Sequence, residues 1–220
     1  MSEQQMMEAF EARDAARVRE LVSQDAGLAR SRKDGVSLLL AARYRGDRAM
    51  TEALRAAGQP LDVFEAAAFD DADRLAVLLD QDPTLATSWS DDGFTPLHLS
   101  AFFGGDAGAR LLVEAGADLN VVSRNDFTVA PLHSAAAGRE DVGLLLVDSG
   151  ADVNVRQRHG WTPLHSAANN GYLRLLEALL AAGADPAAAN DDGVTALDMA
   201  RKAGHDRIVE RLEGMVAAAQ

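Results

Sequence analysis

The sequence predicts an all-α protein built from stacked pairs of helices. Alanine and leucine supply most of its apolar residues, while only 5% of the 220 residues are aromatic, a composition that favours helices over a β-sandwich. A nine-residue block that begins at Gly93 recurs at Gly160 and, 33 residues further on, at Gly193. A fixed period of this length is typical of repeat architectures. We therefore expect about seven helix–turn–helix units joined by short loops.

A second sequence marker has the same period. The tripeptide Gly-Ala-Asp begins at Gly116, Gly150 and Gly183, at intervals of 34 and 33 residues. Together the markers define the motif D-G-x-T-P-L-H-x-A-A, then G, L-L and G-A-D-x-N, which is most complete in residues 92–120 and 159–186. This motif closely resembles the ankyrin repeat. The resemblance implies helix–turn–helix units with short β-hairpin loops, stacked into a curved α-solenoid whose inner helices and hairpins form a concave binding face.

The unit at residues 159–186 shows why each element forms. Thr162-Pro163 predicts the start of the first helix, because threonine is a favourable cap and the fixed φ of proline suits the first helical position. Gly171 and Gly183 permit the positive φ with which the two helices would end. The second helix carries an apolar stripe at helical spacing, formed by Leu175, Leu176, Leu179 and Leu180. Burying four leucines cannot offset the entropy of ordering a whole unit, so the units must be stacked.

The first 90 residues are less regular. Residues 7–29 align with residues 64–86, and Asp82-Pro83 predicts a turn shorter than the hairpin of a full repeat. In the unit at residues 125–150 the Asp-Gly glycine is missing and one residue is added before Pro131, so we expect a different hairpin there. We predict a single domain over residues 1–220. Its units are 1–30 (N-terminal cap), 31–60, 61–88 (degenerate), 89–121, 122–155, 156–188 and 189–220 (C-terminal cap).

Charge and composition exclude several classes of function. The formal charge of −13 makes nucleic acid and anionic membrane surfaces poor partners. Zero cysteine excludes disulfides, thiol nucleophiles and thiolate metal sites. No apolar run approaches the roughly 20 residues of a membrane span, and residues 1–20 hold no signal-peptide core, so we expect a cytoplasmic protein. The alanine- and arginine-rich composition favours a bacterial source.

The histidines invite a catalytic or metal-binding interpretation. His98, His133 and His165 occupy one position of the repeat, and the resemblance implies that they bind a neighbouring backbone group and the threonine of the motif. The sequence holds no H-E-x-x-H zinc motif and no G-x-S-x-G nucleophile motif. We therefore expect no enzymatic activity, no cofactor and no metal.

Surface recognition remains as the function. The resemblance implies that binding residues lie on the hairpins and just before the glycine between the two helices of a unit. The candidates are Tyr44, Arg45, Trp89, Phe94, Phe102, Phe103, Phe127, Arg158, Trp161, Asn169 and Asn170. Seven of the eleven aromatic residues are among them, and aromatic and arginine side chains dominate binding hot spots. For Phe94 and Trp161, packing against the neighbouring hairpin is an equally good interpretation.

We predict a monomeric, non-catalytic scaffold that binds a partner protein through its concave face. Residues 61–120 contain 2 basic and 12 acidic residues, a net charge of −10, so we expect the partner to have a basic rim around an apolar centre. Two alternatives stay open. One is a ligand-binding or enzymatic protein with a pocket at the irregular junction of residues 60–92, and the other is a solenoid that self-associates.

Overall fold

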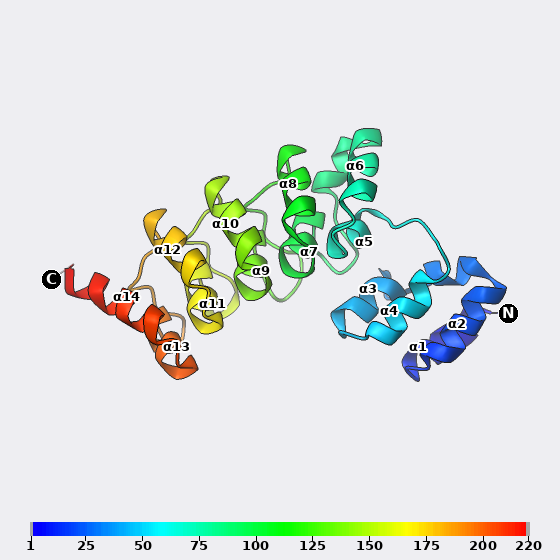
Figure 1. Cartoon of the computed structure of the whole chain (residues 1–220), viewed down its shortest axis with the longest axis horizontal. Coiled ribbons are helices and arrows are strands. Elements are labelled where there is room, and N and C mark those ends of the chain that lie inside the picture. The colour runs from blue at the N-terminus through cyan, green and yellow to red at the C-terminus, as the bar shows by residue number, and fades with distance from the viewer. Residues whose placement is uncertain (1, 219–220) are drawn as a thin grey trace.

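The computed structural model describes residues 2–218, which form a curved row of helix pairs with the two termini at opposite ends (Figure 1). The described residues contain seven such pairs, which confirms the predicted all-α repeat architecture. The first helices of the pairs are α1 (Glu3–Glu11), α3 (Leu38–Tyr44), α5 (Val63–Ala68), α7 (Pro96–Phe103), α9 (Pro131–Gly138), α11 (Pro163–Asn170) and α13 (Ala196–Ala203). The second helices are α2 (Ala15–Gln24), α4 (Arg48–Arg55), α6 (Ala72–Gln81), α8 (Asp106–Glu114), α10 (Glu140–Asp148), α12 (Leu173–Ala181) and α14 (Asp206–Ala218).

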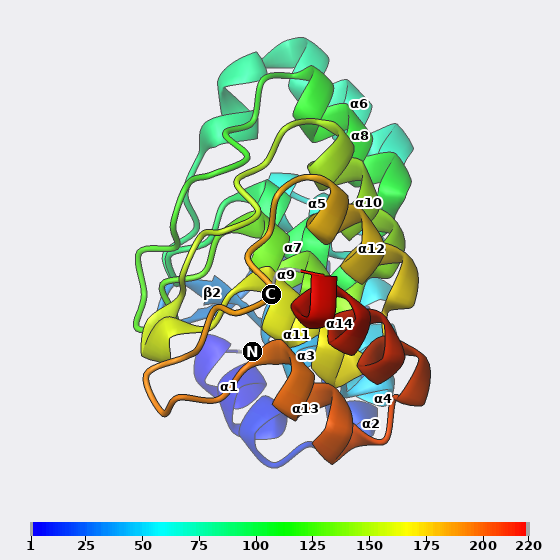
Figure 2. The ribbon, with the colours of Figure 1, turned by 90° about the vertical axis from the view of Figure 1, so that its left-hand side faces the viewer.

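The helices from α5 onward stack in two layers. The first helices α5, α7, α9, α11 and α13 each contact the next, and so do the second helices α6, α8, α10, α12 and α14. Seen from the end of the row, the first helices lie beside the loops and the second helices lie on the far side (Figure 2). The predicted apolar stripe of α12 is buried along its whole length, at Leu175, Leu176, Leu179 and Leu180. Each pair therefore buries its apolar side chains between its two neighbours.

The predicted helix starts are confirmed, with one difference in the capping contact. Thr162 is the N-cap of α11 and Pro163 its first residue. The Thr162 hydroxyl does not bond to the helix backbone but lies 2.8 Å from Nδ1 of His165. In α13, where Asp198 stands in place of the histidine, the Thr195 hydroxyl accepts from the Asp198 backbone N–H at 3.3 Å. In both units the threonine hydroxyl thus bonds to the side chain of the third helical residue, His165 or Asp198.

The two irregular units share one variant of the repeat. In each of them a 3₁₀ helix follows the second α-helix, η1 (Ala26–Arg30) after α2 and η2 (Pro83–Thr87) after α6. Asp25 and Asp82 cap these short helices by accepting from the backbone N–H two residues further on. This is the shorter connection that Asp82-Pro83 predicts.

Most of the predicted hairpins are loops closed by a few backbone hydrogen bonds. Paired strands occur in one of them, where β1 (Arg32–Lys33) and β2 (Val36–Ser37) form an antiparallel ladder. In the next hairpin along the stack, the Ser90 N–H donates to the Phe94 carbonyl at 2.9 Å. A further short 3₁₀ helix, η3 (Arg158–Gly160), lies in the loop before α11. The hairpins project to one side of the stack, beside the first helices (Figure 2).

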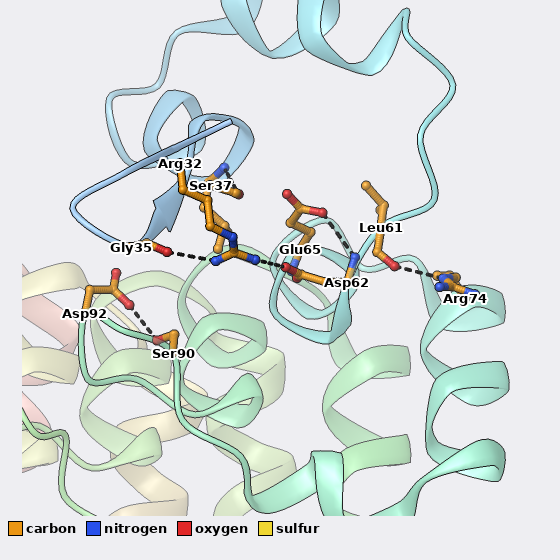
Figure 3. A network of polar contacts seen from close by, with 10 residues as sticks. Arg32, Gly35, Ser37, Leu61, Asp62, Glu65, Arg74, Ser90 and Asp92 are labelled. Atoms are coloured by element: carbon orange, nitrogen blue, oxygen red, sulfur yellow. Dashed lines mark hydrogen bonds and ion pairs between the residues drawn. The ribbon is translucent and has the colours of Figure 1, made fainter. Parts of the chain in front are cut away.

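The stack is interrupted between its second and third helix pairs. The first helices α3 and α5 are in contact, but the second helices α4 and α6 lie far apart in both views (Figures 1 and 2). An ion pair crosses this junction (Figure 3): Arg32 donates to the Asp62 carboxylate at 3.0 Å. Arg32 also donates to the Gly35 carbonyl of its own hairpin at 2.7 Å. Glu65 accepts from the Asp62 backbone N–H at 3.1 Å, and burial, together with the Asp62 charge, raises the pKa of Glu65. The interface between the second and third pairs is therefore thinner than the others.

None of the helices within residues 2–218 has the length and apolar character that crossing a membrane requires.

Candidate functional site

An apolar groove of about 640 Å³ lies on the loop-facing side of the stack. Its floor comes from the first helices α7, α9 and α11, and its wall from the hairpins that precede them. One end is closed by the C-terminus of α3, which contributes Tyr44. The volume falls within the range of about 300 to 1,000 Å³ that is usual for binding pockets.

Five of the predicted binding residues line this groove together, namely Tyr44, Phe94, Phe102, Phe103 and Phe127. Three of the five are large apolar side chains that remain exposed: Tyr44 is 36% exposed, Phe102 43% and Phe127 65%. Phe94 and Phe103 are half-buried and pack against the core. Aromatic side chains exposed side by side in a concave surface are typical of an interaction site.

Tyr44 reaches the groove from the last turn of α3. The Tyr44 ring centroid lies 5.4 Å from that of Phe103, and its hydroxyl donates to the Asp92 carboxylate at 2.6 Å. Burial and this hydrogen bond raise the pKa of Tyr44, so the phenol stays a donor. The N-terminal helix pairs are thereby tied to both a helix and a hairpin of the groove.

Phe127 is presented by the predicted irregular hairpin. Thr128 has a φ of +51°, a conformation that few non-glycine residues adopt. The Asn125 side chain accepts from the Phe127 backbone N–H at 3.2 Å and donates to the Asp92 carbonyl at 2.8 Å. This loop leaves the Phe127 side chain exposed in the lining of the groove.

The three histidines of the repeat are held as neutral imidazoles beneath the groove. Nδ1 of His98 accepts from the Thr95 backbone N–H at 3.2 Å, so its Nε2–H donates to the Val129 carbonyl at 2.9 Å. His133 and His165 make the same pair of bonds in their own units. Burial lowers the pKa of His98 and His133 to about 4 and lowers that of His165. Each histidine joins one repeat to the next, as the resemblance implies.

The two tryptophans do not line the groove. Trp161 is half-buried, packs against the core and lies 6.0 Å from the His165 ring. Trp89 is covered by Arg124, whose guanidinium carbon lies 3.9 Å from the ring centroid. Of the two roles expected for Trp161 and Phe94, binding or packing, Trp161 has the position of a packing residue. Phe94 both packs against the core and lines the groove.

The polar candidates also lie outside the groove lining. Arg45 lies over the Phe10 ring at 4.8 Å and pairs with Glu11 at 3.6 Å. Arg158 is exposed, and its backbone N–H donates to the Phe127 carbonyl at 3.4 Å.

Asn169 and Asn170, also outside the groove lining, contact the neighbouring repeats at the end of α11. The Asn170 side chain donates to the Ala136 carbonyl at 3.0 Å. The Asn169 carbonyl accepts from His205 at 3.0 Å. These contacts run between successive repeats.

Three features of the groove have no counterpart in the sequence-based prediction. Val36 and Val129 extend its apolar wall, and Asp92 is the acidic residue in its lining. The other acidic residues of the segment 61–120 do not line it, so most of that segment's charge lies elsewhere. Val36 and Val129 both have the hairpin position that Phe94 has in its own unit, two residues before the first helix begins, so the repeat alignment could have pointed to both.

A second, smaller cavity of about 220 Å³ lies at the irregular junction, with Gln59, Pro60, Leu61 and Glu65 in its lining. It combines a hollow with a buried carboxyl group of raised pKa, but its volume is below that of usual ligand pockets. Within the described part of the chain, no three acidic or histidine side chains are placed to hold a metal ion.

Comparison with known proteins assigns the repeats. A model of ankyrin repeats in three copies matches residues 6–157, and a second model of ankyrin repeats in many copies matches residues 145–200. The matched ranges include the two irregular N-terminal units and the groove.

The similar curated proteins are much longer than this chain. It is 36% identical over 121 residues to the putative E3 ubiquitin-protein ligase XBAT35 of Arabidopsis thaliana, which is 53% of the chain and 26% of that protein. It is 33% identical over 125 residues to the tyrosine-protein kinase Shark of Drosophila melanogaster, 56% of the chain and 13% of that protein. It is 47% identical over 53 residues to the human ARF GTPase-activating protein GIT1, 24% of the chain and 7% of that protein. The matches thus span only part of each relative.

Proposed function

Because the chain belongs to the ankyrin-repeat family, we propose that it is a non-catalytic interaction module that binds a partner protein in the groove over α7, α9 and α11. Ankyrin repeats are generally protein–protein interaction modules. The observation that carries the proposal is the exposure of Tyr44, Phe102 and Phe127 around one apolar hollow. Large aromatic side chains bury much area with few rotatable bonds, so they favour binding at low entropic cost.

The chemistry of the groove favours a partner with an apolar centre. Asp92 and its neighbour Asp91 lie on the hairpin side, so a basic group on the partner's rim would be attracted there. The Asp92 carboxylate already accepts from Tyr44 and Ser90 and carries no ion pair within residues 2–218. A ligand-binding function for the small junction cavity is less well supported, because of its volume.

Affinity capture with the double variant Phe102→Ser/Phe127→Ser tests the proposal. Both side chains are exposed, so the fold should survive while the apolar contact is lost. We expect captured partners to bind at least about tenfold more weakly than to the unmodified protein, because hot-spot aromatics often contribute 2 kcal/mol or more. The matched control is Val77→Ser, since Val77 is an exposed apolar residue, 47% exposed, on the second helix α6 and away from the groove.

Equal capture by the double variant and the Val77→Ser control would contradict the proposed site. Thermal unfolding of all three proteins provides the check on folding. If the double variant unfolded at the same temperature as the control and still retained every partner, the binding surface would have to lie elsewhere.

A further inference from the structure

Two arginines converge on one carbonyl group at the edge of the groove. Nη2 of Arg43 lies 2.7 Å from the Phe103 carbonyl oxygen, and Nη2 of Arg139 lies 3.4 Å from the same oxygen. Neither guanidinium group has a carboxylate within 4.0 Å among residues 2–218. Two like charges therefore share one site without a counter-ion, in a protein that carries a net charge of −13.

The environment of Arg43 makes the missing counter-ion costly. Its guanidinium carbon lies over two aromatic rings, 5.2 Å from the centroid of Phe69 and 5.6 Å from that of Phe103. Its Nε is buried without a hydrogen-bond partner. Burial and the charge of Arg139 lower the pKa of Arg43. An anion at this place would be attracted by both arginines in surroundings that screen charge less than water does.

Capping of the helix end does not require two cations. The Phe103 carbonyl is at the C-terminus of α7, where carbonyl groups lack partners within the helix. At the equivalent end of α9 a single side chain, Asn170, donates to the Ala136 carbonyl, and at the end of α11 a single side chain, His205, donates to the Asn169 carbonyl. Arg139 occupies the matching position for α7, so Arg43, which comes from α3 on the opposite side, is additional.

The arginine pair continues directly from the apolar groove. Tyr44, Phe103 and Ala137 line the groove. In the chain, Arg43 directly precedes Tyr44, and Arg139 follows Ala137 by two residues. Asp92 approaches from the hairpin side, whereas the arginines lie at the C-terminal ends of the first helices. A segment lying across the groove thus meets opposite charges at its two edges.

We propose that the segment bound in the groove carries a carboxylate side chain, from Asp or Glu, that pairs with Arg43 and Arg139 while its apolar neighbours contact Phe102 and Phe103. The inference rests on the proposed function and adds the partner's chemistry and orientation to it. Guanidinium groups match the two oxygens of a carboxylate in charge and geometry. The acidic residue therefore faces the helix ends, and any basic residue of the partner faces Asp92.

Selection from a displayed library of random 12-residue peptides on the full-length protein tests this proposal. We expect selected peptides to combine aromatic or aliphatic residues with an Asp or Glu at a fixed distance from them. A selected peptide should lose about tenfold in affinity when its acidic residue becomes Asn or Gln. The same loss should follow from Arg139→Gln, and the two changes together should cost little more than either alone.

Arg110→Gln is the matched control, because Arg110 is exposed on the second helix α8 and lines no part of the groove. Arg139 is also exposed, and its contact with the Phe103 carbonyl is long at 3.4 Å, so its substitution should change the urea midpoint little. One outcome would overturn this inference and leave the proposed function standing: selected peptides that lose binding to the Phe102→Ser/Phe127→Ser variant but show no preference for Asp or Glu. Peptides that bind the Phe102→Ser/Phe127→Ser variant as well as the unmodified protein, or a library that yields no binder, would overturn both.

Discussion

At the scale of single residues, the repeat histidines make the fold sensitive to mild acid. Nδ1 of His98 faces the Thr95 backbone N–H, so a proton on Nδ1 would place two donors against each other. Burial lowers the pKa of His98 and His133 to about 4, below the value near 6.5 of an unfolded chain. The unfolded state then binds more protons between these two values, and stability falls as the pH falls through this window.

When the pH is lowered from 7.5 to 5, we expect His98 and His133 each to lower the free energy of unfolding by about 2 kcal/mol. Glu65 acts in the opposite direction, because its pKa is raised in the folded state and its protonation favours that state. Asp198, whose pKa is lowered, adds acid sensitivity only at lower pH. Urea unfolding at both pH values measures the sum, and NMR titration of the imidazole carbons measures each histidine. A titration of His98 and His133 near pH 6.5 would contradict this account.

At the scale of helices, close approach at the ends of the first helices depends on glycine. A Cβ at Gly138, the last residue of α9, would lie 2.5 Å from the Phe102 carbonyl oxygen of α7. Because the obstacle is backbone, α9 would have to move away from α7. We expect Gly138→Ala to lower the free energy of unfolding by about 1 to 3 kcal/mol, as overpacked sites do.

Gly214→Ala is the matched control for this prediction. Gly214 lies in α14, and a Cβ there would meet nothing within 4 Å. Alanine should then stabilise the protein by up to about 1 kcal/mol through its helix propensity. Chemical denaturation of both variants gives the comparison, and equal stability of the two would show that α9 and α7 do not approach as closely as described.

Helix ends and their contacts differ in how far the sequence predicts them. The turn at Gly171 follows from residues within one repeat unit, and the structure has it. The contacts of His165 with Thr162 and with the Val194 carbonyl of the next unit are those that the resemblance to the ankyrin repeat implies. The contact of Tyr44 with Asp92 does not follow in that way. It joins the end of α3 to a hairpin 48 residues further along the chain, and no local pattern specifies a contact over that distance.

At the scale of the whole molecule, the thin junction between the second and third helix pairs should divide unfolding into two steps. The stability of a solenoid is close to a sum of units and nearest-neighbour interfaces. Between these pairs α3 contacts α5, while α4 and α6 lie apart (Figures 1 and 2). We expect residues 3–55 to lose hydrogen-exchange protection at a lower urea concentration than residues 96–212.

Hydrogen exchange followed by mass spectrometry along a urea series measures this directly. Loss of protection at one urea concentration throughout the chain would mean that the polar contacts of Arg32 with Asp62 and of Tyr44 with Asp92 couple the two parts fully. The period of 33 residues predicts that the pairs stack. It does not predict this break, because the linker at residues 56–62 is long enough for more than one arrangement of α4 and α6.

Photo-crosslinking tests the central claim, that the partner binds in the groove, most directly. A benzoylphenylalanine placed at position 127 sits at the groove edge, where the native phenylalanine is 65% exposed, and one placed at position 77 sits on α6. In extracts of the native cells we predict that the protein modified at position 127 forms crosslinks to a partner. An excess of unmodified protein should suppress these crosslinks, whereas an excess of the Phe102→Ser variant should not. Equal crosslinking from positions 127 and 77, or none from position 127, would contradict a binding site in the groove.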